Sequence, residues 1–359
     1  FVSVLAVLIA FAIGAILIAL SGASVVDAYY AMFRGSIVDP NAANAVRMIK
    51  PLTDSLFYSI PLIISGLGLA LGFRAGLFNI GGKGQIIVGA LAAVWVGFAV
   101  SLPPVVHTLV ALLVAVIAGG LYGGIAGVLK AKTGANEVIV TIMLNAIATL
   151  GLGYTLAQKA WQVPGTNQPV TPKVADSAAF ARLLPAPFKL HVGFLVALVA
   201  LVAFWWLIER STLGFQIRAV GANAAAARTA GISVERITAI TMVLSGAFLG
   251  LAGANEALGT IGYVSRDVAG SIGFDAITVA LLGRNKTWGT FGAGLLFGAF
   301  KAGGYAMQAK GVPIDMILIL QSVIVLLIAA PALVRWLFRL PDVCAFAANT
   351  RKGNADEHK

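Results

Sequence analysis

The sequence is poor in charge and has almost no cysteine. Only 11% of its 359 residues are Asp, Glu, Lys or Arg, whereas about a quarter of a typical soluble domain is charged. Cys344 is the only cysteine, so the sequence excludes an intrachain disulfide and a cysteine-rich metal site. The histidines stand far apart, near expected span ends or in the tail, and we predict no metal site from His107, His191 and His358.

The chain also lacks the signatures of an enzyme. No GxxxxGK(S/T) loop is present, and the glycines of GGKG at 81–84 do not form one. No HExxH motif, no paired intramembrane aspartates and no Ser/His arrangement is found. We therefore expect no cofactor in this chain, and the pattern argues against an intramembrane enzyme.

Long apolar stretches dominate what is present. The chain is 59% hydrophobic with a mean hydropathy of +0.94. Residues 85–129 contain no charged side chain, and Pro103 and Pro104 lie near the centre of this stretch. At 1.5 Å per helical residue it is about twice as long as one bilayer crossing. The stretch predicts a hairpin of two spans, in an all-α, polytopic helical membrane protein.

The apolar segments predict about ten transmembrane helices, including one short or broken helix, with both termini cytoplasmic. Residues 1–20 lack the basic region and cleavage site of a signal peptide, so we predict a first span there. Segments 21–54, with an interfacial helix at 46–56, and 158–190 are placed outside. The expected helices are 1–20, 56–73, 85–101, 105–129, 138–157, 191–208, 237–258, the short 272–282, 287–307 and 314–336.

The positions of the Lys and Arg residues agree with the expected membrane topology. The net charge of +11 comes from Lys and Arg residues scattered at the ends of apolar segments. The positive-inside rule and contact with membrane lipid headgroups explain this pattern, and we predict no nucleic-acid partner. The chain then reads as a transmembrane domain, 1–337, and a cytoplasmic tail, 338–359.

A cationic loop at 211–236 interrupts the apolar segments. Asn223 is a favourable N-cap, four alanines follow it, and Gly231 is a favourable helix stop. This pattern predicts a helix of about two turns, which is too short to be stable alone in water. Arg218, Arg228 and Arg236 indicate the cytoplasmic side. Either a soluble motor protein binds this loop, or it is an ordinary cytoplasmic connector.

Polar residues at membrane depth are candidates for a translocation pathway. Several amides and few ion pairs suit a neutral, hydrogen-bonding solute better than a bare ion. Other roles stay open, because carboxylates also compensate helix dipoles and amides also join helices or line a rim. The candidates are Asn79, Gln85, Asn136, Glu137, Asn145, Asn255, Glu256 and Asp275.

Five passages resemble one family along nearly the whole chain, in the same order. They are GLALGFRAGLFNIGGKGQIIVGALAA (66–93), GANEVIVTIMLNAIA (134–148), GFQIRAVGANAAAARTAGI (214–232), SGAFLGLAGANEALG (245–259) and GFDAITVALLGRNKTWGTFGAGLLFG (273–298). They resemble permease subunits of bacterial ABC importers of the branched-chain amino acid, ribose and nucleoside type. The asparagine and glycine passages at 79–81 and 134–137 look closest to the nucleoside (simple sugar) branch.

The resemblance implies a multi-pass subunit of the bacterial cytoplasmic (inner) membrane that imports a small polar solute by alternating access. Its implied partners are cytoplasmic ABC ATPase subunits, which hold the ATP and Mg, a second permease, identical or homologous, and an extracytoplasmic solute-binding protein. Relatives usually carry an acidic residue where this chain has Lys83. The residues implied in ATPase coupling are Gly214, Arg218, Gly221, Ala222, Asn223, Arg228 and Gly231.

Two alternatives stay open. The same machinery would serve a monosaccharide or a branched-chain amino acid, since backbone and amide donors suit all of these solutes. An ion-coupled secondary transporter would need paired carboxylates or an ion site near the midplane, often beside broken helices. The short helix that contains Asp275 keeps this alternative open.

Overall fold

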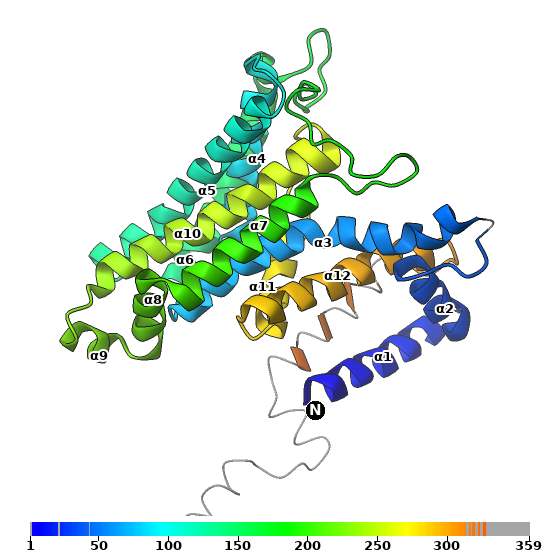
Figure 1. The fold of residues 1–359 in the computed structure, drawn as a ribbon, viewed down its shortest axis with the longest axis horizontal. Coiled ribbons are helices and arrows are strands. Elements are labelled where there is room, and N and C mark those ends of the chain that lie inside the picture. The colour runs from blue at the N-terminus through cyan, green and yellow to red at the C-terminus, as the bar shows by residue number, and fades with distance from the viewer. Residues whose placement is uncertain are drawn as a thin grey trace, which may run out of the picture. The chain divides into compact units, whose positions relative to one another are not determined.

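The computed structural model describes residues 2–20, 22–42 and 44–313, with a few isolated positions from 316 to 327. This described part is helical, with one isolated bridge, between Arg182 and His191, as its only strand-like pairing (Figure 1). The chain divides into two compact units, one of residues 32–306 and one of residues 1–31 and 307–359. The expected tail, 338–359, lies outside the described residues, as does most of the expected span at 314–336.

The unit that contains the N-terminal residues begins with the predicted first helix. Helix α1 (Val2–Leu20) is followed by α2 (Val25–Ser36), whose later residues belong to the other unit. The Tyr29 hydroxyl donates to the carbonyl of Phe11, and the two rings stack edge to face with centroids 5.5 Å apart. This contact fixes the start of α2 against α1.

Helix α3 (Ala45–Arg74) corrects the expected division of this region. We expected an interfacial helix at 46–56 and a separate span at 56–73, but a single 30-residue helix covers both, with Pro51 and Pro61 inside it. At 1.5 Å per residue it is about 45 Å long, so it extends beyond one hydrocarbon layer. Residues 59–72 are all buried, so α3 is the central helix of the unit of residues 32–306.

Glycines bring the helices around α3 into direct backbone contact. Helices α4 (Gly82–Ala99), α5 (Val106–Thr133) and α10 (Val234–Asn255) pack together, and α6 (Glu137–Ala157) packs on α4 and α5. A Cβ atom on Gly119 would lie 2.5 Å from the carbonyl oxygen of Gly246. Small residues therefore allow the backbones of α5 and α10 to approach closely.

The remaining helices range from three to 22 residues in length. They are η1 (Lys159–Trp161), α7 (Gly193–Trp205), η2 (Trp206–Arg210), α8 (Thr212–Ala222), α9 (Ala224–Thr229), η3 (Glu256–Ile261), α11 (Ile272–Leu282) and α12 (Thr287–Gln308). The short helix predicted at 272–282 is confirmed with the same bounds. Within the described residues, six helices are long and apolar enough to cross a membrane: Ala45–Arg74, Gly82–Ala99, Val106–Thr133, Glu137–Ala157, Gly193–Arg210 and Val234–Ile261.

The unit of residues 32–306 has two distinct ends. Helices α8 and α9 lie at one end of the bundle, and the long loop at 158–192 lies at the other (Figure 1). We call these the α9 end and the loop end. The loop is fastened to the chain after α10, because Val174 N donates to Gly262 O at 2.9 Å and Phe180 N donates to Leu258 O at 3.0 Å. The loop end of α10 is therefore covered by ordered backbone.

Candidate functional site

A group of buried amides lies at the start of α4. The Asn79 side-chain nitrogen donates to Gln85 Oε1 at 3.0 Å and to Ser245 Oγ at 2.9 Å. Its side-chain oxygen accepts from the backbone nitrogen of Gly81 at 2.9 Å. Asn79 and Gln85 are each 1% exposed. These bonds fix the turn before α4 against α10.

Asn145 fixes the same turn against α6. Its side-chain nitrogen donates to Ile80 O at 2.8 Å, and its oxygen accepts from Gly84 N at 2.8 Å. The amides of Asn79, Gln85 and Asn145 therefore all have partners within the protein. This is how buried polar groups join helices, and it is one of the alternatives that the sequence left open for Asn145.

Two further predicted pathway residues lie at the N-terminus of α6. The Asn136 side chain caps this helix by accepting from Val138 N at 2.9 Å. Glu137 begins the helix, forms an ion pair with Lys130 at 2.7 Å and accepts from Phe78 N at 3.4 Å. Both residues thus serve the α5–α6 turn at the α9 end, in agreement with the helix-dipole alternative for Glu137.

A second polar group lies toward the loop end, where α10 passes into the π-helix η3. Glu256 is 8% exposed and accepts a 3.4 Å hydrogen bond from the hydroxyl of Thr260. Asp275, in the first turn of α11, pairs with Lys301 of α12 at 2.8 Å. Lys301 also acts electrostatically on Glu256. Because π-helical turns are frequent at functional sites, this group is the stronger pathway candidate.

The sequence analysis did not select Lys301 as a candidate, although its position in an apolar segment could have indicated it. It is the only charged residue within the 22 residues of α12. A lone lysine inside an apolar helix needs an anionic partner, and the structure supplies Asp275 at 2.8 Å.

Asn255 and His191 have buried polar atoms that no described residue satisfies. Asn255 is 0% exposed, and neither atom of its amide has a hydrogen-bond partner in the described structure. His191 is 2% exposed, and its Nε2 atom likewise has none. Burial lowers the pKa of His191 to about 4, so its ring is neutral near pH 7.

A polar cavity of about 820 Å³ is bounded by the segment from α2 to α3, the loop at 158–192 and α12. The rings of Tyr58 and Tyr305 stand 5.3 Å apart in its wall. The Asp54 carboxylate pairs with Lys50 through one oxygen, while its other oxygen is buried without a partner in the described residues. The lining residues are Gly35, Asp39, Arg47, Lys50, Pro51, Asp54, Tyr58, Pro187, Lys189, Ala302, Tyr305 and Ala306.

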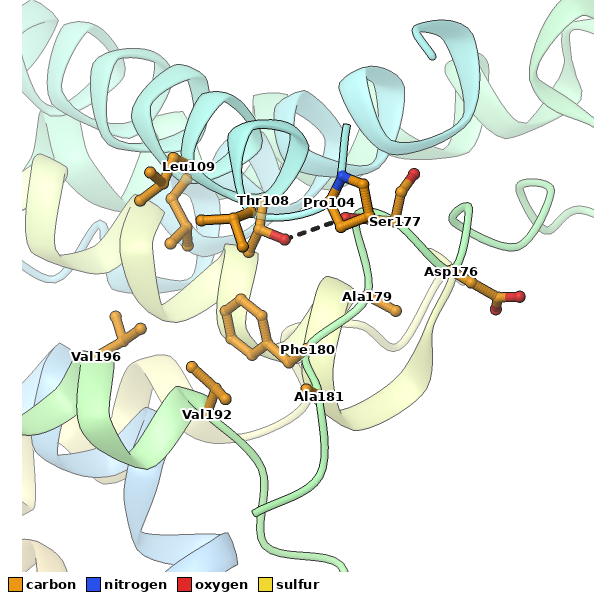
Figure 2. A pocket seen from close by; sticks show the side chains of 12 residues that line it. Pro104, Thr108, Leu109, Asp176, Ser177, Ala179, Phe180, Ala181, Val192 and Val196 are labelled. Carbon is orange, nitrogen blue, oxygen red and sulfur yellow. Dashed lines mark hydrogen bonds between the residues drawn. The ribbon is translucent and has the colours of Figure 1, made fainter. Parts of the chain in front are cut away.

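A smaller cavity of about 330 Å³ at the loop end has mostly apolar walls. Figure 2 shows the ring of Phe180 between Thr108 on one side and Val192 and Val196 on the other. Thr108 Oγ1 donates to Ser177 O at 3.3 Å and so ties α5 to the loop. The Phe180 ring also lies 5.5 Å from the ring of His191.

The short helix predicted in the 211–236 loop is confirmed. Asn223 caps α9 by accepting from Ala226 N at 3.0 Å, and the chain leaves the helix through Gly231, whose φ of 82° favours glycine. Arg228 is exposed and pairs with Glu235 at 2.5 Å. The cap and the ion pair hold α9 between α8 and α10.

The sequence reading missed α8, which precedes α9. Ser211 caps it by accepting from Gly214 N at 2.9 Å, a signal that could have predicted a helix start. A Cβ on Gly221 would clash with the carbonyl oxygen of Arg74, so α8 packs directly on the end of α3. Arg218 donates to the carbonyl of Ile208 and fastens α8 to η2.

Helices α8 and α9 enclose an apolar groove of about 550 Å³. Phe215 of α8 lies in its wall and is exposed. Ala222 and Asn223 belong to the lining, whereas Arg228 and Gly231 do not. The groove is lined by Thr212, Phe215, Gln216, Ala219, Ala222, Asn223, Ala226, Ala227, Ala230 and Ile232.

Long apolar helices joined by buried amides define a multi-pass membrane protein. A family model described as the permease component of a branched-chain amino acid transport system matches residues 52–329. The chain belongs to this family of ABC-transporter permease components, which are multi-pass proteins of the cytoplasmic membrane. The resemblance of the five passages is thereby confirmed.

Three relatives match over most of their lengths. The guanosine ABC transporter permease protein NupP of Bacillus subtilis is 40% identical over 93% of this chain and 94% of its own. The glucose ABC transporter permease protein TsgB13 of Haloferax volcanii is 35% identical over 90% and 85%. The nucleoside ABC transporter permease protein NupB of Lactococcus lactis is 31% identical over 98% and 97%. No solved structure matches the chain.

Proposed function

We propose that this chain is the permease subunit of an importer that carries nucleosides into the cytoplasm, powered by ATPase subunits. The observation that carries the proposal is the similarity to NupP and NupB, which extends over more than nine-tenths of each chain. The buried amide of Asn255, which has no partner among the described residues, supports it, because a neutral hydrogen-bonding group suits an uncharged polar solute better than an ion.

We assign the contact with the ATPase to α8, α9 and their groove. A six-residue helix is not stable alone, and α9 instead presents an apolar groove beside the exposed Arg228. An ATPase that fills this groove would move α9, and α8 would pass the movement to the end of α3 through Gly221. The assigned residues are Gly214, Arg218, Gly221, Ala222, Asn223, Arg228 and Gly231.

The same proposal sets the assembly and topology. The α9 end faces the cytoplasm, the loop end faces an extracytoplasmic solute-binding protein, and a second permease completes the pathway. ATP and Mg are bound by the ATPase subunits. About ten crossings within residues 1–337 place both termini in the cytoplasm, with 338–359 as a tail.

We assign the translocation pathway to two levels. Asn255, Glu256 and Asp275 face the solute toward the loop end, where the Asn255 amide has no partner among the described residues. At the α9 end, the pathway is bordered by residues whose internal bonds hold the first turns of α4 and α6: Asn79, Gln85, Asn136, Glu137 and Asn145.

A monosaccharide is the second candidate solute. It is favoured by the 35% identity to TsgB13, a glucose permease protein, over 90% of this chain. Sugar hydroxyls both donate and accept hydrogen bonds, so the unpartnered Asn255 amide suits them too.

Uptake into proteoliposomes tests the function. The full chain, its second permease, its ATPase and its binding protein are reconstituted, and radiolabelled nucleosides, ribose, glucose and leucine are offered with and without internal ATP. ATP-dependent nucleoside accumulation is the expected result. Accumulation of a sugar or leucine would overturn the substrate, and accumulation driven by an ion gradient without ATP would overturn the mechanism.

A further inference from the structure

Seven buried polar side-chain atoms have no hydrogen-bond partner in the described structure, and four of them belong to Asp54, Asn285, Thr287 and Thr290. Asn255 and His191 hold the other three. These atoms are both ends of the Asn255 amide and Nε2 of His191. Each unsatisfied polar atom buried away from water costs about 1–3 kcal/mol. A ligand that supplies the missing hydrogen bonds would explain why these unsatisfied atoms are present.

Two glycines hold these side chains together. A methyl group on Gly193 would clash with the Asn255 side-chain oxygen and would come within 2.6 Å of Nδ1 of His191. A methyl group on Gly259 would lie 2.8 Å from His191 Nε2. Gly259 follows Asn255 by four residues, about one helical turn, so His191 packs along the face of α10 and η3 that carries Asn255.

The hydrogen bonds present determine which groups the site offers. Gly193 N donates to His191 Nδ1 at 3.1 Å, so Nδ1 is an acceptor and the proton of the neutral ring is on Nε2. His191 therefore offers one donor, Nε2–H. The Asn255 amide adds two donor hydrogens and an acceptor oxygen.

Aromatic rings pack around His191. The rings of Phe57 and Phe180 lie 5.4 Å and 5.5 Å from that of His191. Tyr58, the residue after Phe57, lines the 820 Å³ cavity, as does Lys189, two residues before His191. The two segments of chain that carry Phe57 and His191 therefore each border this cavity.

We propose that the Asn255 amide and the Nε2–H of His191 bind the edge of the heterocyclic base of the transported nucleoside. A base edge presents adjacent donors and acceptors that an asparagine amide can pair with, and a ring nitrogen or carbonyl accepts from His191. This inference rests on the proposed function and names residues that select its substrate.

Asn255→Leu tests the proposal against Asn79→Leu. Both asparagines are buried, but only Asn79 is fully bonded within the protein. Asn79→Leu should lower the thermal midpoint of the reconstituted complex, because it leaves Gln85 and Ser245 without their partner. Asn255→Leu should leave the midpoint unchanged or raise it, and should reduce ATP-driven nucleoside uptake on the order of tenfold or more.

Substrate ratios separate binding from packing. Uptake of guanosine, adenosine and cytidine is compared for the wild type, Asn255→Leu, His191→Leu and His191→Gln. A base contact predicts that the leucine variants change the ratios among the three nucleosides and that His191→Gln, which retains a donor, restores part of the uptake. Unchanged uptake, an equal loss for all three nucleosides or a failure of Asn255→Leu to fold would each overturn the site.

Uptake by the wild-type complex distinguishes a failure of the proposed function from a failure of the base site. If it accumulates sugar and no nucleoside, the proposed function fails and the base site fails with it. If it accumulates nucleosides and the variants match it, only the base site fails.

Discussion

The contact between α5 and α10 allows a quantitative test of the packing. In Gly250→Ala, the new methyl group would clash with the carbonyl oxygen of Ala115 and lie 3.0 Å from the Cα of Gly119. These neighbours are backbone atoms of α5, so no side-chain rotation can relieve the overlap. Since ordinary carbon contacts are about 3.5–4.0 Å, the two helices must separate by on the order of 1 Å.

This separation sets the expected magnitude. Overpacking a well-packed core costs about 1–3 kcal/mol, and a clash with backbone belongs at the upper end of that range. Gly153→Ala in α6 is the matched control, because nothing lies within 4 Å of a Cβ at that position. The control should be neutral or stabilising by up to about 1 kcal/mol, which is the helix propensity that alanine gains over glycine.

Thermal unfolding of the purified protein in detergent, followed by tryptophan fluorescence, measures both variants. We expect Gly250→Ala to lower the midpoint by several degrees and Gly153→Ala to leave it unchanged or raise it. Equal midpoints for Gly250→Ala and the wild type would show that the helices do not meet backbone to backbone.

Three further predictions address single charged or titratable groups. Arg228→Glu should keep membrane insertion and basal ATPase activity but reduce ATP-driven uptake about tenfold or more, because a charged contact with the ATPase is lost. Adding Glu235→Arg restores the exposed ion pair within this chain, which is worth at most about 1 kcal/mol, so full recovery of uptake in the double variant would refute an ATPase contact. The pKa of His191 in the folded state is lowered to about 4 from 6.5, so the stability that is fully present above pH 6.5 is lost as the pH falls from 6.5 to 4, by about 3 kcal/mol in total. His191→Gln should flatten the curve of thermal midpoint against pH between these two values, and an unchanged slope would contradict the assignment. Lys83→Glu, at the N-terminus of α4, should stabilise the folded protein by about 0.3–1 kcal/mol through the helix dipole and so raise the thermal midpoint. A lowered midpoint would contradict this prediction and indicate an anionic partner for Lys83.

The buried asparagines show where sequence reasoning ends. Asn79 and Asn255 look alike in the sequence, since each stands in an apolar stretch with a glycine two residues away. Asn79 is satisfied by Ser245, 166 residues away, whereas Asn255 has no partner among the described residues. No local pattern reports such distant pairings, so only the tertiary structure separates a packing amide from a candidate binding amide.

The sequence by itself determined the features that depend on near neighbours. Hydropathy and the lack of charge predicted a helical membrane protein, and cap chemistry predicted α9 with Asn223 at its start and Gly231 after its end. The tertiary structure decided the continuity of α3 through Pro51 and Pro61. At Pro61, where the helix is fully buried, burial outweighs the local effect of proline. The tertiary structure also decided the meeting of His191 with α10, since close packing between remote segments, not local preference, places them together.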